Sequence, residues 1–383
     1  MRVETSAYDV VVLGEGEETF VNLVRAQRQG EPLGKMPGLA FRNNGKIVNT
    51  GLANRIREVG QIPWPDWESF PIQEYIQRNQ SNGINIGLSM PLLATRGCPY
   101  QCTFCSSPNM WTTRYIARSV DDVLDEMEFY HRRYGVINFD LQDLTAIIKR
   151  RWAIEFCEKL IERNLGFTWQ MPSGTRTEVF DKTVADLLYR SGCRNLAFAP
   201  ESGSPEILEY TQKRVDLEKM QEAMKIAVDS GLSMSCFFII GFPVDTRKTM
   251  RQTLRLIRRV AMLGVQDVAV SKFVPYPGSK LFKLLLSEGK IELTDEYFIS
   301  PMDFYTKQAP SYAEEISTGY LYRMMIWMFL NFYVISFLFH PLRTVKVLAK
   351  ALWKGQEETR YAKWLLDRIR VRRRWRKQER SAG

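Results

Sequence analysis

Residues that commonly bind metals are scarce in this 383-residue sequence, which has six cysteines and two histidines. A charged-then-apolar leader with a cleavage site is also absent after Met1, so a secreted disulfide scaffold is not expected. A reducing cytoplasm is the predicted location. With 45% hydrophobic and 25% charged residues, the composition excludes disordered and collagen-like chains and fits one large domain or two ordinary ones.

A net charge is absent from most of the chain. Residues 343–383 contain 14 Lys and Arg against 4 Asp and Glu, which accounts for the whole net charge of +10. Residues 1–342 are therefore neutral. Because the basic surplus is confined to the tail and no recognition module is evident, nucleic acid is not an expected partner.

A repeat of about 35 residues runs through the middle of the chain, and in each unit a short apolar run precedes a helical pattern. This alternation is typical of parallel strands joined by crossover helices. The six runs are residues 90–95, 136–140, 167–172, 195–200, 233–240 and 267–274. The predicted fold class is α/β, a partial (βα)6 TIM-like barrel, with functional residues at the carboxyl ends of its strands.

The regions that flank this barrel differ in pattern from it. A strand, a helix and a hairpin that turns at Asn44 and Gly45 indicate a small N-terminal α/β fragment, which alone cannot close a core. Prolines and tryptophans then mark a linker that wraps over the barrel. The predicted domains are residues 1–60 (α/β fragment), 61–85 (linker), 86–288 (barrel) and 289–383 (loop and apolar, basic helical extension).

Three cysteines, Cys98, Cys102 and Cys105, fall within eight residues after the first predicted barrel strand. Their CxxxCxxC spacing can hold three irons of a four-iron four-sulfur ([4Fe-4S]) cluster and leave the fourth iron without a protein ligand. A zinc knuckle is the alternative interpretation. Zinc usually has four ligands, however, and neither His131 nor His340 has a suitable spacing.

The cysteine motif, its position after the first strand and the six βα repeats resemble the radical S-adenosylmethionine (radical SAM) enzymes. The resemblance implies that Cys98, Cys102 and Cys105 are both metal ligands and catalytic residues, and that the open iron binds S-adenosylmethionine. One electron then cleaves this cofactor to methionine and a 5′-deoxyadenosyl radical. A low-potential electron donor of flavodoxin or ferredoxin type is implied as a partner.

Residues at the strand ends match the same family. The resemblance implies that Asp140 faces the ammonium group of S-adenosylmethionine and that Glu201 and Ser202 bind its ribose and methionine moieties. Glycine and proline turns after the last two strands let the backbone approach adenine. The predicted cofactor-binding residues are Phe104, Asp140, Ser173, Arg176, Glu201, Ser202, Gly241 and Pro275.

The remaining cysteines, Cys157, Cys193 and Cys236, stand apart in helical or apolar segments. We expect all three to be small core residues. A second cysteine cluster is therefore not evident in the sequence, which argues against the methylthiotransferase, twitch and SPASM branches of the family.

The N-terminal fragment resembles the end of the cobalamin-binding domain in cobalamin-dependent radical SAM proteins, among them the anaerobic magnesium-protoporphyrin monomethyl ester cyclase-like and the lipid-modifying enzymes. The matching stretches are residues 9–17, 38–40 and 63–66. A complete cobalamin domain needs on the order of 100 residues or more, and no DxHxxG motif occurs. We expect a truncated remnant or a variant without the corrin, so cobalamin binding stays an open alternative.

These resemblances predict radical modification of an apolar biosynthetic substrate by cyclisation, oxidation or methylation. A small lipid-like or tetrapyrrole-like molecule is the expected substrate. Two alternatives stay open: a cobalamin-dependent methyltransferase, and a non-catalytic partner subunit that binds the cluster without turnover.

The C-terminal extension begins with an apolar stretch at residues 324–339. As a helix its 16 residues would span about 24 Å, less than the roughly 30 Å of a bilayer core, although extension back to Tyr320 would reach that length. An amphipathic and basic helix follows, up to Trp375. A peripheral contact of this tail with the inner face of the membrane is one interpretation, and a helical cap with a solvated tail is the other.

Overall fold

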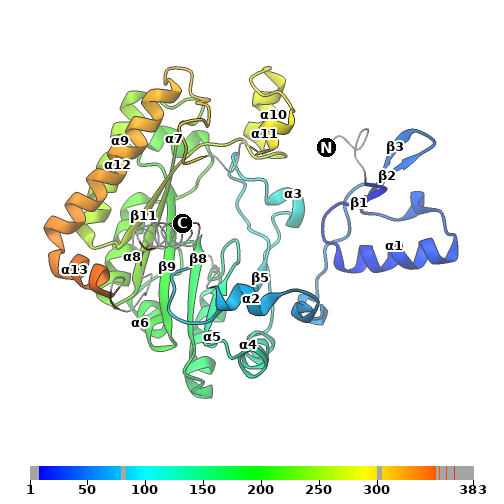
Figure 1. The fold of residues 1–383 in the computed structure, drawn as a ribbon, viewed down its shortest axis with the longest axis horizontal. Coiled ribbons are helices and arrows are strands. Elements are labelled where there is room, and N and C mark those ends of the chain that lie inside the picture. The colour runs from blue at the N-terminus through cyan, green and yellow to red at the C-terminus, as the bar shows by residue number, and fades with distance from the viewer. Residues whose placement is uncertain are drawn as a thin grey trace, which may run out of the picture.

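The computed structural model describes residues 8–78, 83–299 and 304–350, with the single positions 353, 359 and 366. A six-stranded parallel sheet, in the order β11-β10-β9-β8-β7-β4, forms its centre (Figure 1). These strands are β4 Ser89–Leu92, β7 Asn138–Leu141, β8 Thr168–Thr175, β9 Cys193–Glu201, β10 Ser233–Ile240 and β11 Asp267–Lys272. The six predicted strands and the α/β fold class are confirmed.

Helices cross over between these strands and bury one side each. They are α4 Val120–Tyr134, α5 Arg150–Arg163, α6 Lys182–Arg190, α7 Pro205–Tyr210, α8 Leu217–Asp229 and α9 Arg247–Leu263. The Ser119 hydroxyl caps α4 by accepting the Asp122 N–H at 3.3 Å, and Thr246 and Thr249 form a capping box at the start of α9. The main core is the apolar layer between helices and sheet, with Phe156 and Ile257 almost fully buried.

A separate three-stranded antiparallel sheet forms the N-terminal part. Its elements are β1 Val10–Val12, α1 Glu17–Gln29, the short 3-10 helix η2 Leu33–Lys35, β2 Leu39–Asn43 and β3 Lys46–Asn49. Asn44 (φ 48°) and Gly45 (φ 77°) both adopt the left-handed conformation that a two-residue hairpin turn requires, as predicted. This part lies at one side of the barrel, opposite the flank occupied by α9 (Figure 1).

The segment between this sheet and the barrel packs on α4. It contains η3 Val59–Gln61, η4 Trp67–Ser69 and α2 Ile72–Gln77. The Trp64 indole donates a hydrogen bond to Asp122 at 2.9 Å, and the Trp67 indole donates one to the Tyr130 hydroxyl at 3.0 Å. These two tryptophans fix the path of the segment across the outside of the barrel.

The remaining elements lie outside the central sheet and its crossover helices. They are β5 Thr95–Arg96, α3 Pro108–Trp111, β6 Ile116–Ala117, α10 Lys280–Ser287, α11 Asp295–Ile299, α12 Thr318–Phe339 and α13 Pro341–Ala349. Among them, α12 packs against α9 and β11. β5 and β6 pair with each other and flank the loop that carries the clustered cysteines.

The apolar helix α12 is longer than predicted. The apolar run predicts a start at Met324, or at Tyr320 if the helix is extended, but the Ser317 hydroxyl accepts the Tyr320 N–H at 3.3 Å and caps a helix that begins at Thr318. The 22 residues of α12 span about 33 Å, and among the described residues it is the one helix that is long and apolar enough to cross a membrane. The predicted basic helix through Trp364 and Trp375 lies outside the described residues.

Candidate active site

The loop after β5 carries Cys98, Cys102 and Cys105 and is constrained at its start and in its middle. Gly97 precedes the first cysteine with φ 82°, and a Cβ at this position would overlap the carbonyl oxygen of Arg114. In the middle of the loop, the Thr103 N–H donates to the Thr211 carbonyl at 2.9 Å and the Thr103 carbonyl accepts the Leu281 N–H at 2.9 Å. Only glycine fits the entry to this loop, and the backbone of Thr103 anchors it to two other segments.

All three cysteines of the loop line one cavity of about 210 Å³. The opposite wall comes from the carboxyl ends of β8 and β9 and from the loops after β7 and α7. The lining residues are Cys98, Tyr100, Cys102, Phe104, Cys105, Ser107, Pro108, Leu144, Thr145, Ser173, Gly174, Thr175, Arg176, Ala199, Glu201 and Lys213. The cysteines are half-buried and free of disulfides, so their sulfurs are accessible from the cavity.

Two threonine hydroxyls in this cavity lack a hydrogen-bond partner among the described residues. Thr145 is 1% exposed and Thr175 is 4% exposed, and neither Oγ1 is bonded. A buried hydroxyl without a partner is unfavourable by roughly 1–3 kcal/mol. Their position in the wall of a cavity indicates that a polar ligand supplies the missing partners.

Paired charges complete the wall. The Lys213 ammonium donates to the Glu201 carboxylate at 2.8 Å, and both side chains are only 9% exposed. Glu201 has a positive φ of 65°, which is uncommon outside glycine and marks a constrained position. The guanidinium of Arg176 stacks on the Tyr100 ring at 3.7 Å and donates to Glu178 at 2.9 Å.

Both burial and the neighbouring cations shift the pKa of the Cys98 and Cys102 thiols. Burial raises the pKa of the Cys98 and Cys102 thiols, and the charges of Lys213 and Arg176 act in the opposite direction. Among the described residues, no group of three or more His, Cys, Asp or Glu side chains converges on a single metal ion. A four-iron cluster requires a different arrangement, because each thiolate binds a different iron. The three accessible thiols, the neighbouring cations and the two partnerless hydroxyls fit such a cluster with a polar ligand beside it.

An aromatic cavity of about 260 Å³ adjoins the cysteine cavity and shares four lining residues with it. The shared residues are Phe104, Ser173, Ala199 and Glu201. The rings come from Phe237 on β10, from Phe273 and Tyr276 after β11, and from Phe304 and Tyr305 after α11. The shared residues join the two cavities, so an apolar molecule in the second cavity would lie next to a ligand in the first.

Comparison with known families matches residues 92–257 to the radical SAM superfamily. The chain carries a radical SAM domain. Members of this superfamily use a four-iron four-sulfur cluster and S-adenosylmethionine, the two cofactors that the sequence resemblance implies.

Curated relatives of this radical SAM chain include methyltransferases and a cyclase. An uncharacterized methyltransferase of Pyrococcus horikoshii is 32% identical, over 75% of this chain and 60% of the relative. The anaerobic magnesium-protoporphyrin IX monomethyl ester cyclase of Cereibacter sphaeroides is 31% identical, over 77% of this chain and 47% of the relative. This chain therefore spans about half the length of the curated relatives it matches.

Solved structures with the same fold include two cobalamin-dependent radical SAM proteins. OxsB with aqua-cobalamin and S-adenosylmethionine bound has a TM-score of 0.62 at 14% identity, over 95% of this chain and 59% of that chain. TsrM from Kitasatospora setae, with cobalamin and a [4Fe-4S] cluster bound, has a TM-score of 0.59 at 19% identity, over 73% of this chain and 54% of that chain. At these identities the likeness shows the fold.

The predicted cofactor residues of the radical SAM domain occupy two kinds of position. Phe104, Ser173, Arg176 and Glu201 line the cysteine cavity with the three cysteines. The other four, Asp140, Ser202, Gly241 and Pro275, are not among its lining residues. Their roles toward the cofactor stay predictions.

These four residues take part in contacts within the barrel. Asp140 accepts hydrogen bonds from Asn138 at 3.1 Å and Gln170 at 2.6 Å inside the sheet. The Ser202 hydroxyl bonds Thr253 at 3.0 Å, the Gly241 N–H donates to Asp245 at 2.7 Å, and the Pro275 carbonyl accepts the Tyr297 hydroxyl. Each of them therefore helps to shape a strand end.

The N-terminal part contacts the cysteine loop of the radical SAM domain through a buried carboxylate. Glu15 follows β1, is inaccessible to solvent at its side chain, and forms ion pairs with Arg55 and Arg96. Its other oxygen accepts the Ile56 N–H at 2.6 Å. Arg96 immediately precedes Gly97, so this ion-pair network joins the N-terminal part to the start of the loop.

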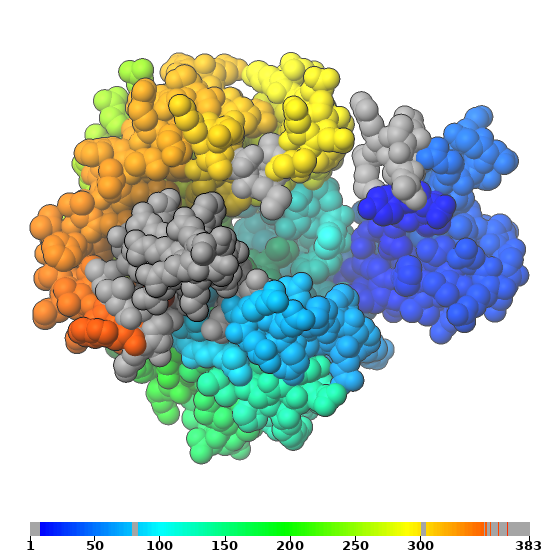
Figure 2. All heavy atoms as spheres, in the orientation of Figure 1, coloured from blue at the N-terminus to red at the C-terminus, as the bar shows by residue number. Residues whose placement is uncertain are grey.

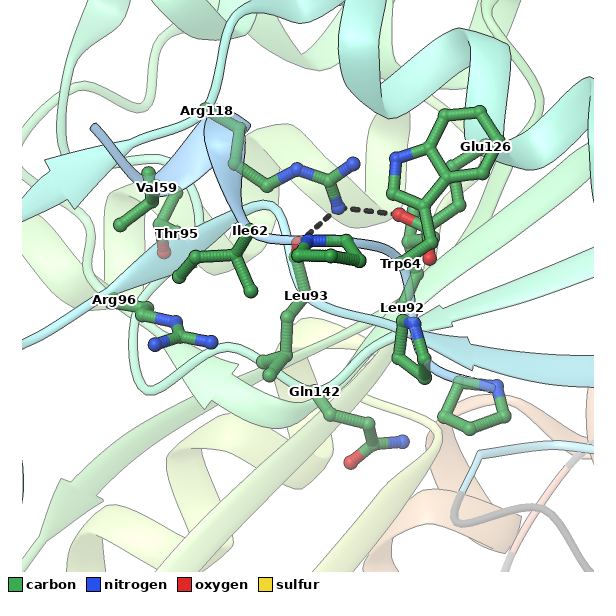
Figure 3. Close-up of a pocket in the computed structure, with 13 residues that line it drawn as sticks. Val59, Ile62, Trp64, Leu92, Leu93, Thr95, Arg96, Arg118, Glu126 and Gln142 are labelled. Atoms are coloured by element: carbon green, nitrogen blue, oxygen red, sulfur yellow. Dashed lines mark hydrogen bonds and ion pairs between the residues drawn. The ribbon is translucent and has the colours of Figure 1, made fainter. Parts of the chain in front are cut away.

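A further cavity of about 200 Å³ is lined by residues from the 59–65 segment, from β4 and β5, and from α4 (Figure 3). Its charged residues all have ion-pair partners: Arg118 pairs with Asp122 and Glu126, and Arg96 pairs with Glu15 and Glu17. Arg118 also donates to the Leu93 carbonyl at 2.8 Å. Unlike the cysteine cavity, it contains no thiol. The cysteine cavity is therefore the candidate active site.

Several residues of this site are not among the predicted cofactor-binding residues. Lys213 reaches the cavity from the loop after α7, and Thr145 reaches it from the loop after β7. No local motif marks Lys213, because its partner Glu201 belongs to the preceding strand. Thr145 and Thr175 do follow the rule that strand-end residues gather at the carboxyl face, so this rule could have identified them.

Proposed function

We propose that this protein is a radical SAM enzyme that cleaves S-adenosylmethionine reductively and starts a radical modification of an apolar small molecule. The observation that carries the proposal is one cavity in which three free cysteine thiols lie with two buried, partnerless threonine hydroxyls. Cys98, Cys102 and Cys105 would hold the cluster. When bound, the cluster supplies one electron that splits S-adenosylmethionine into methionine and a 5′-deoxyadenosyl radical.

Residues of the chain would hold the nucleoside and its amino acid group in place. The Thr145 and Thr175 hydroxyls can bond its polar atoms, and this removes the cost of leaving them without partners. Lys213 and Arg176 offer positive charge to a carboxylate, while Glu201 offers negative charge to an ammonium or ribose hydroxyl. Phe104 lines both this cavity and the aromatic one, where rings would exclude water from a reactive carbon.

Anaerobic loading with ferrous iron and sulfide, followed by reduction with dithionite, tests this function. We expect a brown protein that converts S-adenosylmethionine to 5′-deoxyadenosine and methionine. Cys102→Ala should lose the cluster absorbance and the product. Cys157→Ala is the matched control, because Cys157 is buried in α5 away from the cavity and should leave both unchanged. Wild-type protein that binds the cluster but yields no 5′-deoxyadenosine would support the partner-subunit alternative.

The aromatic cavity supports an apolar, ring-containing or lipid-like substrate. Its aromatic rings can contact a flat molecule by stacking, and its polar surface is limited to a few groups. A tetrapyrrole-like or lipid-like small molecule, modified by cyclisation, oxidation or methylation, fits this lining. A soluble low-potential flavodoxin or ferredoxin in the cytoplasm would deliver the electron, and the basic C-terminal tail would provide a peripheral contact with the inner face of the membrane.

Methyl transfer that depends on cobalamin is the second candidate function. It is supported by the N-terminal sheet, which contacts the cysteine loop through Glu15, and by the likeness of the fold to OxsB and TsrM. The products separate the two candidates. Methyl transfer releases S-adenosylhomocysteine and yields a methylated product, whereas cyclisation or oxidation consumes S-adenosylmethionine without methylating the substrate.

A further inference from the structure

The flank formed by α9, α12 and α13 combines an apolar surface with a basic one. α12 lies beside α9 with its ends in the same order: Arg247 stacks on Tyr320 at 4.9 Å, and Arg258 donates to Asn331 at 2.9 Å. Arg343 at the start of α13 bonds the Gly264 carbonyl and, at 2.8 Å, the Ser336 hydroxyl. The three helices therefore form one continuous face, whose orange part is seen in Figure 2.

The outer side of α12 and α13 is exposed and almost wholly apolar. Its members include Leu338 at 66%, Phe339 at 58% and Leu342 at 77% exposure. The full exposed set is Ile326, Trp327, Leu330, Val334, Phe337, Leu338, Phe339, Leu342 and Val345. A contiguous apolar surface of this size on a folded protein marks an interaction site.

The charge of the same flank has one sign. α9 contains six Lys and Arg and no Asp or Glu, and Lys248, Arg251 and Arg255 form an exposed row at helical spacing. From Ser317 to Lys350, the segment that includes α12 and α13, the chain again has no acidic residue. A partner for this flank must therefore combine an apolar interior with a negatively charged surface.

The opposite side of α12 is buried in the main core, and this limits how the helix can contact such a partner. Leu321, Met325, Met328 and Phe332 are at most 1% exposed and belong to the main core. A helix that gives one side to the core cannot be surrounded by lipid, so it cannot cross a bilayer as it stands. It can lie in the plane of the interface, with its apolar side among the acyl chains and its basic neighbours at the headgroups.

We propose that the α9–α12–α13 flank docks on the surface of an anionic lipid bilayer. Each Lys or Arg near such a surface contributes about 1 kcal/mol, so the row on α9 strengthens binding to anionic lipid over neutral lipid. The proposal does not depend on the reaction at the cysteine cavity. It also differs from a contact through the basic tail, because it places the contact on folded helices.

Flotation of the full chain with phosphatidylcholine vesicles, with and without phosphatidylglycerol, tests the docking. We expect binding to the anionic vesicles and little binding to the neutral ones. Lys248→Gln/Arg251→Gln/Arg255→Gln should weaken partition onto anionic vesicles by roughly 100-fold, as expected for three lost contacts. Leu338→Gln/Phe339→Gln should weaken it at least about tenfold through lost apolar burial.

A matched control is Phe20→Gln/Val21→Gln on α1, where both side chains are also exposed, 57% and 45%. This variant should float like the wild type, and unchanged thermal unfolding would show that all variants are folded. Two results would overturn the proposal: wild-type flotation that neither flank variant alters, which assigns binding to the tail, and absence of any flotation. A dimer of wild-type chains that Leu338→Gln/Phe339→Gln dissociates would instead identify a second copy as the occupant.

Discussion

Among single residues, Asp143 has a strongly perturbed carboxyl group that supports the cysteine loop. It accepts the Ala94 N–H at 3.2 Å and the Thr95 hydroxyl, just ahead of β5 and the cysteines. Burial raises its pKa from 3.8 to about 6, and these hydrogen bonds limit the rise. Folding therefore disfavours the charged form of Asp143 relative to the unfolded chain.

This shift predicts a pH effect on stability of definite sign. Because the folded carboxyl binds its proton more tightly than the unfolded one, the contribution is fully present below pH 4 and is lost as the pH rises through about 6. Wild type should gain about 2 kcal/mol of unfolding free energy relative to Asp143→Asn between pH 7.5 and pH 4.5. Urea unfolding of both apoproteins at the two pH values measures this difference. Equal differences at both pH values would contradict the shift.

Gly97 provides a second test at this scale. Alanine there would be strained by the positive φ and would overlap the Arg114 carbonyl, so we expect the loop to move and the iron bound after reconstitution to fall several-fold. Gly45→Ala is the matched control, since Gly45 also has a positive φ but nothing lies within 4 Å of its Cβ position. It should cost roughly 1–2 kcal/mol of stability and leave iron binding intact. Similar iron contents in the two variants would argue against steric selection of glycine.

At the scale of elements, the sequence predicts what depends on local pattern. The alternation of apolar runs and amphipathic stretches locates six strands within a few residues, and Asn44-Gly45 specifies its hairpin turn because the required φ is local. The start of α12 was misplaced because the cap at Ser317 lies outside the apolar run. The approach of Lys213 to Glu201 depends on how α7 returns to the barrel, which no local pattern encodes.

The tie between the N-terminal part and the cysteine loop yields a prediction for elements. Glu15→Gln removes the carboxylate that Arg55 and Arg96 share, and Arg96 keeps only its ion pair with Glu17, which should destabilise this contact by on the order of 3 kcal/mol. We expect faster proteolysis within residues 8–56 and a lower iron content after reconstitution. Glu18→Gln, an exposed residue in the first turn of α1, should change neither. Unchanged proteolysis of Glu15→Gln would show that the contact does not hold the two parts together.

In the whole molecule, the candidate active site and the apolar, basic flank occupy different surfaces. Residues 1–342 carry no net charge, the site opens at the carboxyl ends of the strands, and the apolar and basic flank lies on the side away from the N-terminal sheet. The proposal places both cofactors in the cysteine cavity, so binding of one should depend on the other. The unfolding free energy of the whole chain should therefore report whether ligands bind at the cysteine cavity.

S-adenosylmethionine should stabilise the cluster-loaded chain. A ligand at 100 times its dissociation constant adds about 2.7 kcal/mol to the unfolding free energy if it binds only the folded state. For a chain of this size that corresponds to a rise of roughly 3–5 °C in Tm.

Cys102→Ala, which lacks a complete cluster, should show a much smaller rise, and Cys157→Ala should match wild type, because its thiol is buried away from the cavity. Anaerobic calorimetry measures all three proteins. An equal rise in Cys102→Ala and wild type would mean that S-adenosylmethionine binds independently of the cluster, contrary to a shared site in the cysteine cavity.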